Sequence, residues 1–179
     1  ANRSTSRPPS RCTSSLPSLS RPGTAFVPVV YDSLAPSLGL QPMFSGLFPT
    51  TSAGAPSGDT AAHIHCCTVL PFTGTGSVAT TLPAFVGFPL GVDSGSFDNL
   101  LDPYKLNECS FWNPIFLGVC TITNVSTAEA TFAAGLVNGT EYFNIHPNAV
   151  PGGEIRGFLV EQVPAPAPPT PSWAGPCVL

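Results

Sequence analysis

Residues 141–163 read EYFNIHPNAVPGGEIRGFLVEQV, and this stretch decides the fold class. Residues 141–146 and 154–163 have the side-chain pattern of β-strands. The Pro-Gly-Gly sequence of residues 151–153, which lies between them, is a turn signal. The stretch therefore predicts two strands joined by a turn and places the fold among the β-rich classes.

Outward from this pair, Thr, Val and Phe remain common while the helix formers Lys, Glu and Gln are scarce. The one helical pattern is STAEATFAAGL, residues 126–136, where Ser126 and Glu129 have the spacing of a capping box. The sequence predicts an antiparallel β-sandwich with one short helix. Further strands are expected at 26–31, 61–70 and 74–82, with an apolar stretch at 42–48 and a small-residue loop at 50–59.

Composition narrows the class of protein further. The chain has 179 residues, 42% hydrophobic and 9% charged, with a net charge of −4. This length fits one domain with appendages, and so few charges exclude charge-rich disorder. Apolar runs are short and broken by Pro or Gly, so no membrane-spanning helix is expected. The acidic balance gives no reason to expect nucleic-acid binding.

Two arms flank the predicted domain. Residues 1–24 are rich in Ser, Pro and Arg, residues 25–163 form the domain, and residues 164–179 are Pro-rich. Four Arg and no acid lie in the first arm, whereas all ten acids follow it. An arm of one copy could therefore dock on the acidic body of the next and build a homo-oligomer or an open fibre. The alternative is that each arm folds back on its own domain.

Cysteines and glycosylation sequons indicate the compartment. The six cysteines, an even number, suit disulfides in an oxidising compartment, and three sequons predict N-glycans at Asn2, Asn124 and Asn138. No signal peptide is visible and the first residue is not Met, so the chain is interpreted as a mature secreted product, located outside the cell or at its wall or surface.

The pairing of the cysteines is left partly open by the sequence. Cys109 and Cys120 flank an aromatic segment and are expected to pair. Cys66 and Cys67 are adjacent, and on a strand their side chains point to opposite faces. They are therefore assigned to the two arm cysteines, with a Cys66–Cys67 bond as the alternative. The arm cysteines are Cys12 and Cys177.

The three histidines are the candidate metal ligands. His63 and His65 project from one face of a predicted strand, and His146 lies near the end of another. If the two strands are neighbours, the three imidazoles form a set suited to Cu or Zn. The alternative is that they make hydrogen bonds between strands within the fold.

A second polar motif lies after the Pro-Gly-Gly turn. Glu154 and Arg156 fall on one face of the second predicted strand, where they are expected to pair or to bond turn backbone; a buried Glu154 could also orient or join a metal ligand. The sequence has no nucleophile elbow, no phosphate-binding loop and no recognisable pair of catalytic carboxylates. The expectation is a protein that is not an enzyme.

The segments AAHIHCC, residues 61–67, and NIHPNAVPGGEIRGFL, residues 144–159, resemble the CHRD (chordin-type) domain, most closely its secreted bacterial branch. The resemblance spans about residues 26–161. It implies an extracellular β-sandwich of Greek-key, immunoglobulin-like appearance and implies little about activity. The Pro-rich arms and four of the cysteines depart from the family's pattern.

Two functions follow from this reading. The preferred one is a non-catalytic secreted structural or binding module, a subunit of an extracellular assembly that could be a glycosylated fibre. The alternative is an extracellular Cu or Zn protein with a three-histidine site, loosely similar to the His-x-His strand of copper–zinc superoxide dismutase.

Overall fold

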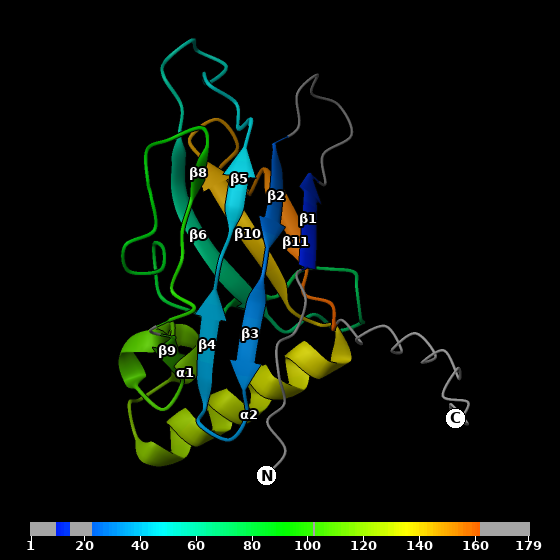
Figure 1. Ribbon diagram of the computed structural model, residues 1–179, viewed down its shortest axis with the longest axis vertical. Helices are drawn as coiled ribbons and strands as arrows, with labels where there is room; N and C mark the ends of the chain where they lie inside the picture. Colours follow the sequence, from blue (N-terminus) through cyan, green and yellow to red (C-terminus); the bar gives the residue numbers. More distant parts are fainter. Residues whose placement is uncertain (1–9, 15–22, 102, 162–179) are drawn as a thin grey trace, which may run out of the picture.

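The computed structural model describes residues 10–14, 23–101 and 103–161, which form two antiparallel sheets (Figure 1). The larger sheet has eight strands, in the order β7 (Ser77–Val78), β6 (Asp59–Cys66), β10 (Tyr142–Pro147), β11 (Ile155–Phe158), β1 (Ser10–Ser14), β2 (Thr24–Val27), β5 (Met43–Ser45) and β8 (Gly95–Ser96). The smaller sheet has the order β3 (Val29–Asp32), β4 (Ser37–Leu40) and β9 (Tyr104–Lys105).

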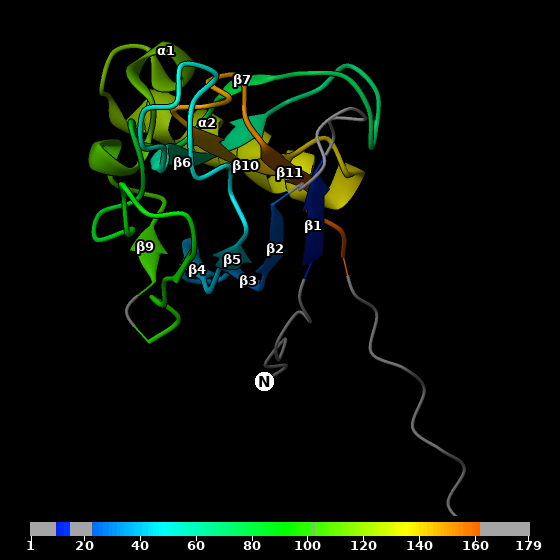
Figure 2. The same ribbon diagram turned by 90° about the horizontal axis from the view of Figure 1, so that it is seen from above.

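The large sheet folds over on itself, so that β6, β10 and β11 form one layer and β2 and β5 lie opposite (Figure 2). Alternate residues of both layers point inward and are buried, among them Ile64, Phe143 and Ile145 on one side and Val27 and Phe44 on the other. This confirms the predicted antiparallel β-sandwich. The opposite residues of β6 and β10, which include the histidines, face away from this core.

Several predicted strands are shorter than expected. The strand expected at 26–31 is divided at Pro28 into β2 and β3, which belong to different sheets. Proline has no N–H group to donate to a ladder and commonly marks such a break. The strand expected at 61–70 ends at Cys66, and that expected at 74–82 is reduced to the two residues of β7. The edge strands β8 and β9 have no clear pattern in the sequence.

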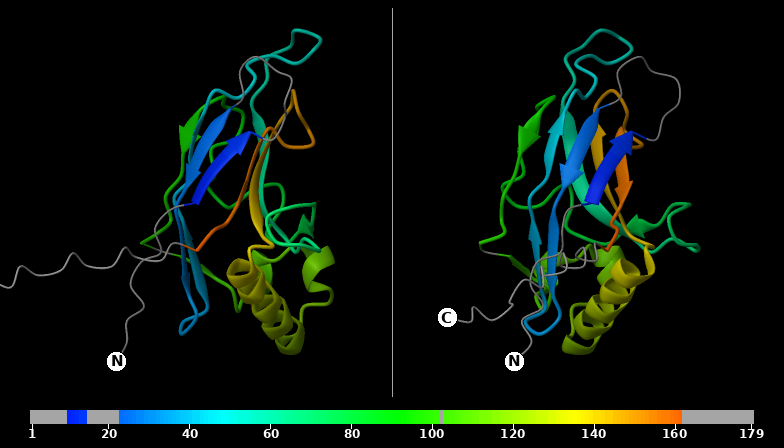
Figure 3. Two further views of the ribbon diagram at one scale, coloured as in Figure 1. Left: turned by 90° about the vertical axis from the view of Figure 1, so that its right-hand side faces the viewer. Right: turned by 45° about the vertical axis from the view of Figure 1, so that its right-hand side comes forward.

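The main helix, α2 (Ile122–Asn138), is longer than the predicted 126–136 and runs across one end of the two layers (Figure 3). The predicted cap is wrong: Thr121, not Ser126, is the N-cap, and its side-chain oxygen accepts a hydrogen bond from the backbone N–H of Asn124. Gly139 ends the helix in the left-handed conformation. Two short helical segments precede it, η1 (Cys109–Phe111) and α1 (Pro114–Leu117).

Part of the N-terminal arm is a strand of the sheet. β1 lies within residues 1–24, and its backbone pairs with β11 on one side and β2 on the other. β1 thus joins the two layers of the sandwich along one side. No helix in the described part of the chain has the length and hydrophobicity needed to cross a membrane.

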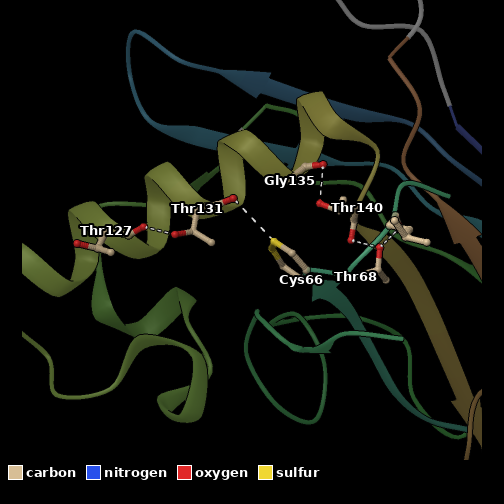
Figure 4. Close-up of a disulfide and its surroundings, with 8 residues drawn as sticks. Cys66, Thr68, Thr127, Thr131, Gly135 and Thr140 are labelled. Carbon is tan, nitrogen blue, oxygen red and sulfur yellow. Dashed lines mark hydrogen bonds between the residues drawn. A yellow bond between two sulfur atoms is a disulfide. The ribbon is translucent and has the colours of Figure 1, made fainter. Parts of the chain in front are cut away.

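The structure has the expected Cys109–Cys120 disulfide. It also joins Cys66 to Cys67, so the assignment of these two residues to the arm cysteines is wrong and the vicinal alternative is the one found (Figure 4). The argument from opposite faces fails because β6 ends at Cys66 and Cys67 has already left the strand. The sulfur of Cys67 lies 3.9 Å from the Thr131 carbonyl oxygen of α2. The side chain of Cys12 and all of Cys177 lie outside the described residues.

Candidate metal centre

β6 and β10 bring the three histidines together. They pair antiparallel, with Asn144 opposite His63 and His146 opposite Ala61, so His146 is the diagonal neighbour of His63 on one face of the sheet. The ring centroid of His63 lies 4.9 Å from that of His65 and 4.7 Å from that of His146. The centroids of His65 and His146 are 6.0 Å apart. The predicted neighbouring strands therefore exist.

Each imidazole is held through its Nδ1 atom by one backbone carbonyl oxygen. His63 Nδ1 lies 3.2 Å from the Pro83 oxygen, His65 Nδ1 lies 2.8 Å from that of Gly76, and His146 Nδ1 lies 2.8 Å from that of Pro151. A carbonyl oxygen can only accept, so each Nδ1 must carry the hydrogen. In a neutral imidazole the Nε2 atom then has a free lone pair.

The three Nε2 atoms are buried, and none of them has a hydrogen-bond partner. One ligand atom from each histidine can be chosen so that all three lie within 4.8 Å of one another. Buried nitrogen lone pairs without a donor lack the hydrogen bonds they would make in water. A cation bound by all three would satisfy them, while the predicted alternative of hydrogen bonds within the fold is met at each Nδ1, which bonds a backbone carbonyl oxygen.

Burial keeps these imidazoles uncharged. The pKa of His63 is lowered to about 4, mainly by desolvation and in part by the neighbouring His146 and His65, against the raising effect of the Pro83 carbonyl. Desolvation also lowers the pKa of His65 and of His146. Neutral imidazole is the form that binds metal, so the site needs little or no deprotonation at neutral pH.

His65 stacks on Tyr142, which in turn contacts Arg156. The rings of His65 and Tyr142 are stacked, with centroids 4.5 Å apart and planes at 11°. The Arg156 guanidinium carbon lies 3.7 Å from the Tyr142 centroid, and because two groups cannot share one ring face at these distances, Tyr142 lies between them. The Tyr142 hydroxyl lies 3.2 Å from both the nitrogen and the oxygen of Gly76, the residue that holds His65.

The carboxylate of Glu154 is bound by backbone N–H groups and is not part of the histidine group. It is 1% exposed, and its two carboxylate oxygens accept hydrogen bonds of 3.0 Å from the backbone N–H groups of Gly23 and Phe48. Arg156 instead donates to the carbonyl oxygen of Gly74. The two residues thus bond to backbone and not to each other, and the backbone they contact belongs to other segments rather than to their own turn.

The two sequons inside the described residues lie at the ends of α2 rather than in loops. Asn124 is in the first turn, where its side-chain amide donates to the Val119 carbonyl oxygen at 2.7 Å. Asn138 is the last helical residue and is exposed. Asn2 lies outside the described residues.

Sequence reasoning identified the three imidazoles but missed the groups that hold them. The carbonyl oxygens of Gly76, Pro83 and Pro151 leave no signal in a sequence, because every residue has a carbonyl group. The stack of Tyr142 on His65 could have been anticipated from the strand register, since the two residues face each other directly across β10 and β6.

The fold and the histidine group together define an antiparallel β-sandwich domain with a three-imidazole cluster on its outer face. Comparison with known families matches residues 13–159 to the CHRD domain, and the chain belongs to this family. CHRD domains occur in extracellular proteins, as binding modules rather than enzymes. No curated protein and no solved structure matches the chain.

Proposed function

We propose that the chain is an extracellular, non-catalytic binding module that holds one copper or zinc ion on His63, His65 and His146. The observation that carries the proposal is the set of three buried Nε2 atoms without partners, each on a ring whose Nδ1 is fixed by a carbonyl oxygen. Carbonyl acceptors on the second nitrogen are the usual support of histidine ligands in metal sites.

Metal titration of the purified full-length chain tests this function. The protein is stripped with a chelator and titrated with Zn(II) and with copper, while bound metal is measured by elemental analysis and stability by thermal unfolding. We expect one ion per chain and a higher unfolding temperature, because a ligand that binds only the folded state stabilises it. Unchanged unfolding and no retained metal would contradict the proposal.

Two substitutions make the test specific to the site. His146→Gln removes one Nε2 ligand, and we expect it to abolish the stabilisation by metal. Asn148→Ala changes an exposed residue two positions further on, and it is the matched control. Equal loss of metal binding in both variants would show that binding depends on the fold of this loop and not on the imidazole.

A second function, as a building block of an extracellular assembly, is favoured by the position of β1. This strand comes from the basic arm and lies between two strands of the body, β2 and β11. We propose that the same place can be taken by β1 of a second copy, which would link chains head to tail. As part of this proposal, the chain is related to the secreted bacterial branch of the family. It also carries N-glycans at Asn138, Asn124 and Asn2.

Light scattering under non-reducing conditions tests the assembly. The full chain is compared with a chain that lacks residues 1–22, over a range of concentrations. We expect higher oligomers that form only when the arm is present. A monomer at every concentration would contradict the proposed assembly and leave the metal site unaffected.

A further inference from the structure

The donor set of the histidine group consists of three neutral nitrogen atoms. Among the described residues, the donor atoms that gather within 4.8 Å at this place belong to the three imidazoles and include no carboxylate and no thiolate. Glu154, the nearest acid in the sequence motif, has both oxygens bound by backbone N–H groups. Any ion bound here therefore keeps its full charge.

That charge is expensive to bury. The free energy of moving an ion out of water rises with the square of its charge, so a divalent ion costs about four times as much as a monovalent ion of similar size. The guanidinium of Arg156, on the far side of Tyr142 from His65, adds a further positive charge nearby. The surroundings therefore favour a monovalent ion.

The number of ligands points in the same direction. Zn(II) in proteins is almost always four-coordinate, so a site with three protein ligands must also admit a water molecule, and Cu(II) prefers a tetragonal arrangement. The histidine group supplies three ligand atoms, all buried from solvent. Cu(I) accepts three nitrogen ligands in a trigonal arrangement, so it needs no water molecule to enter the buried site as a fourth donor.

From charge and ligand number we infer that the three-histidine group is selective for copper in the +1 state over Zn(II) and Cu(II). The inference rests on the proposed metal-binding function and adds the identity and oxidation state of the ion. The domain would then carry or sequester Cu(I) outside the cell, where an extracellular reductant such as ascorbate supplies the electron that converts Cu(II) to Cu(I).

Competition with chromophoric chelators under anaerobic conditions measures this selectivity on the full chain. Bicinchoninate is the competitor for Cu(I), and pyridylazoresorcinol is the competitor for Zn(II). We expect one Cu(I) per chain, bound at least about 100-fold more tightly than Zn(II). We also expect an X-ray absorption edge typical of three-coordinate Cu(I), and loss of the Cu(II) paramagnetic signal on addition of ascorbate.

Asn144→Asp tests the reason for the selectivity. Asn144 is 4% exposed, it lies directly opposite His63, and its side-chain oxygen has no hydrogen-bond partner. The substitution keeps the shape of the side chain and adds one negative charge beside the site. We expect the preference for Cu(I) over Zn(II) to fall at least about tenfold. Circular dichroism confirms that the variant is folded, and an unchanged preference in the folded variant would overturn the charge argument.

The outcomes separate this inference from the proposed function. If the chain binds Zn(II) or Cu(II) through the histidines as tightly as Cu(I), the inference fails and the metal-binding function stands. If the chain binds none of the three ions, both fail. If Cu(I) binds tightly to the wild type but equally well to His146→Gln, the histidine site is not its location and both fail.

Discussion

Two buried polar groups on the β6–β10–β11 side of the molecule differ in how far their hydrogen-bonding atoms are satisfied. Glu154 has a backbone N–H group for each carboxylate oxygen. The histidine group bonds its three Nδ1 atoms to backbone carbonyl oxygens but leaves its three buried Nε2 atoms without a hydrogen-bond partner. Both groups were candidates for function in the sequence.

The difference separates a structural role from a binding role. A buried charge with two hydrogen bonds stabilises the fold, because it fixes the segments at Gly23 and Phe48 against the turn before β11. Buried lone pairs without partners cost stability and are retained only where something else is gained. Each of the following predictions tests this contrast between Glu154 and the histidines.

The largest effect is expected for His63→Gln, which should weaken metal binding about 1,000-fold, equivalent to about 4 kcal/mol. The metal-free protein should lose no more than about 1 kcal/mol, because loss of the hydrogen bond to the Pro83 carbonyl is offset by removal of a buried nitrogen without a partner. Metal titration and urea unfolding of the same preparations check both halves. A strongly destabilised metal-free variant would place His63 with Glu154 as a structural residue.

Glu154→Gln should show the reverse behaviour. The amide nitrogen of Gln cannot accept from the second backbone N–H group, and the carboxylate charge is lost, so we expect a loss of about 2–3 kcal/mol in the free energy of unfolding. Metal stoichiometry should stay at the wild-type value. Urea unfolding measures the loss, and a change in the number of ions bound would show that the two groups are not independent.

The pH dependence of the metal-free protein should report the histidines. Their pKa values are lowered in the folded state, so between about pH 6.5 and pH 4 the unfolded chain binds protons that the folded chain does not. Stability should therefore be full above about pH 6.5 and fall as the pH is lowered toward 4, by about 3 kcal/mol for His63. Unfolding curves of wild type and His63→Gln at several pH values test this, and identical slopes would contradict it.

The smallest effect is expected for Tyr142→Phe, which keeps the ring stacked on His65 and removes the hydroxyl that contacts Gly76. We expect a loss of about 1 kcal/mol in stability. Metal affinity should fall by about tenfold or less, because the carbonyl oxygen that holds His65 becomes less well positioned. Competition titration measures the affinity, and a loss as large as that of His63→Gln would make Tyr142 part of the binding site itself.

The sequence predicted the β-sandwich and the three-histidine set because both depend on alternation along strands, which local patterns record. His63 and His65 had to share a face once β6 was a strand, and His146 needed only a neighbouring strand. The disulfide partner of Cys66 depended on where that strand ends. The N-cap of α2 lies about one turn before the residues whose pattern is recognisably helical. Such ends are decided by tertiary contacts that a single sequence does not encode locally.

The carbonyl oxygens that hold the imidazoles belong to backbone positions rather than to particular side chains. Two of them, those of Gly76 and Pro83, lie on the segment that follows β6 and covers the histidine face. Relatives of this protein can therefore exchange many side chains in this segment and keep the three imidazoles oriented. An insertion or deletion between residues 67 and 84 would instead displace both acceptors at once, so in a set of related chains the length of this segment should vary less than its composition.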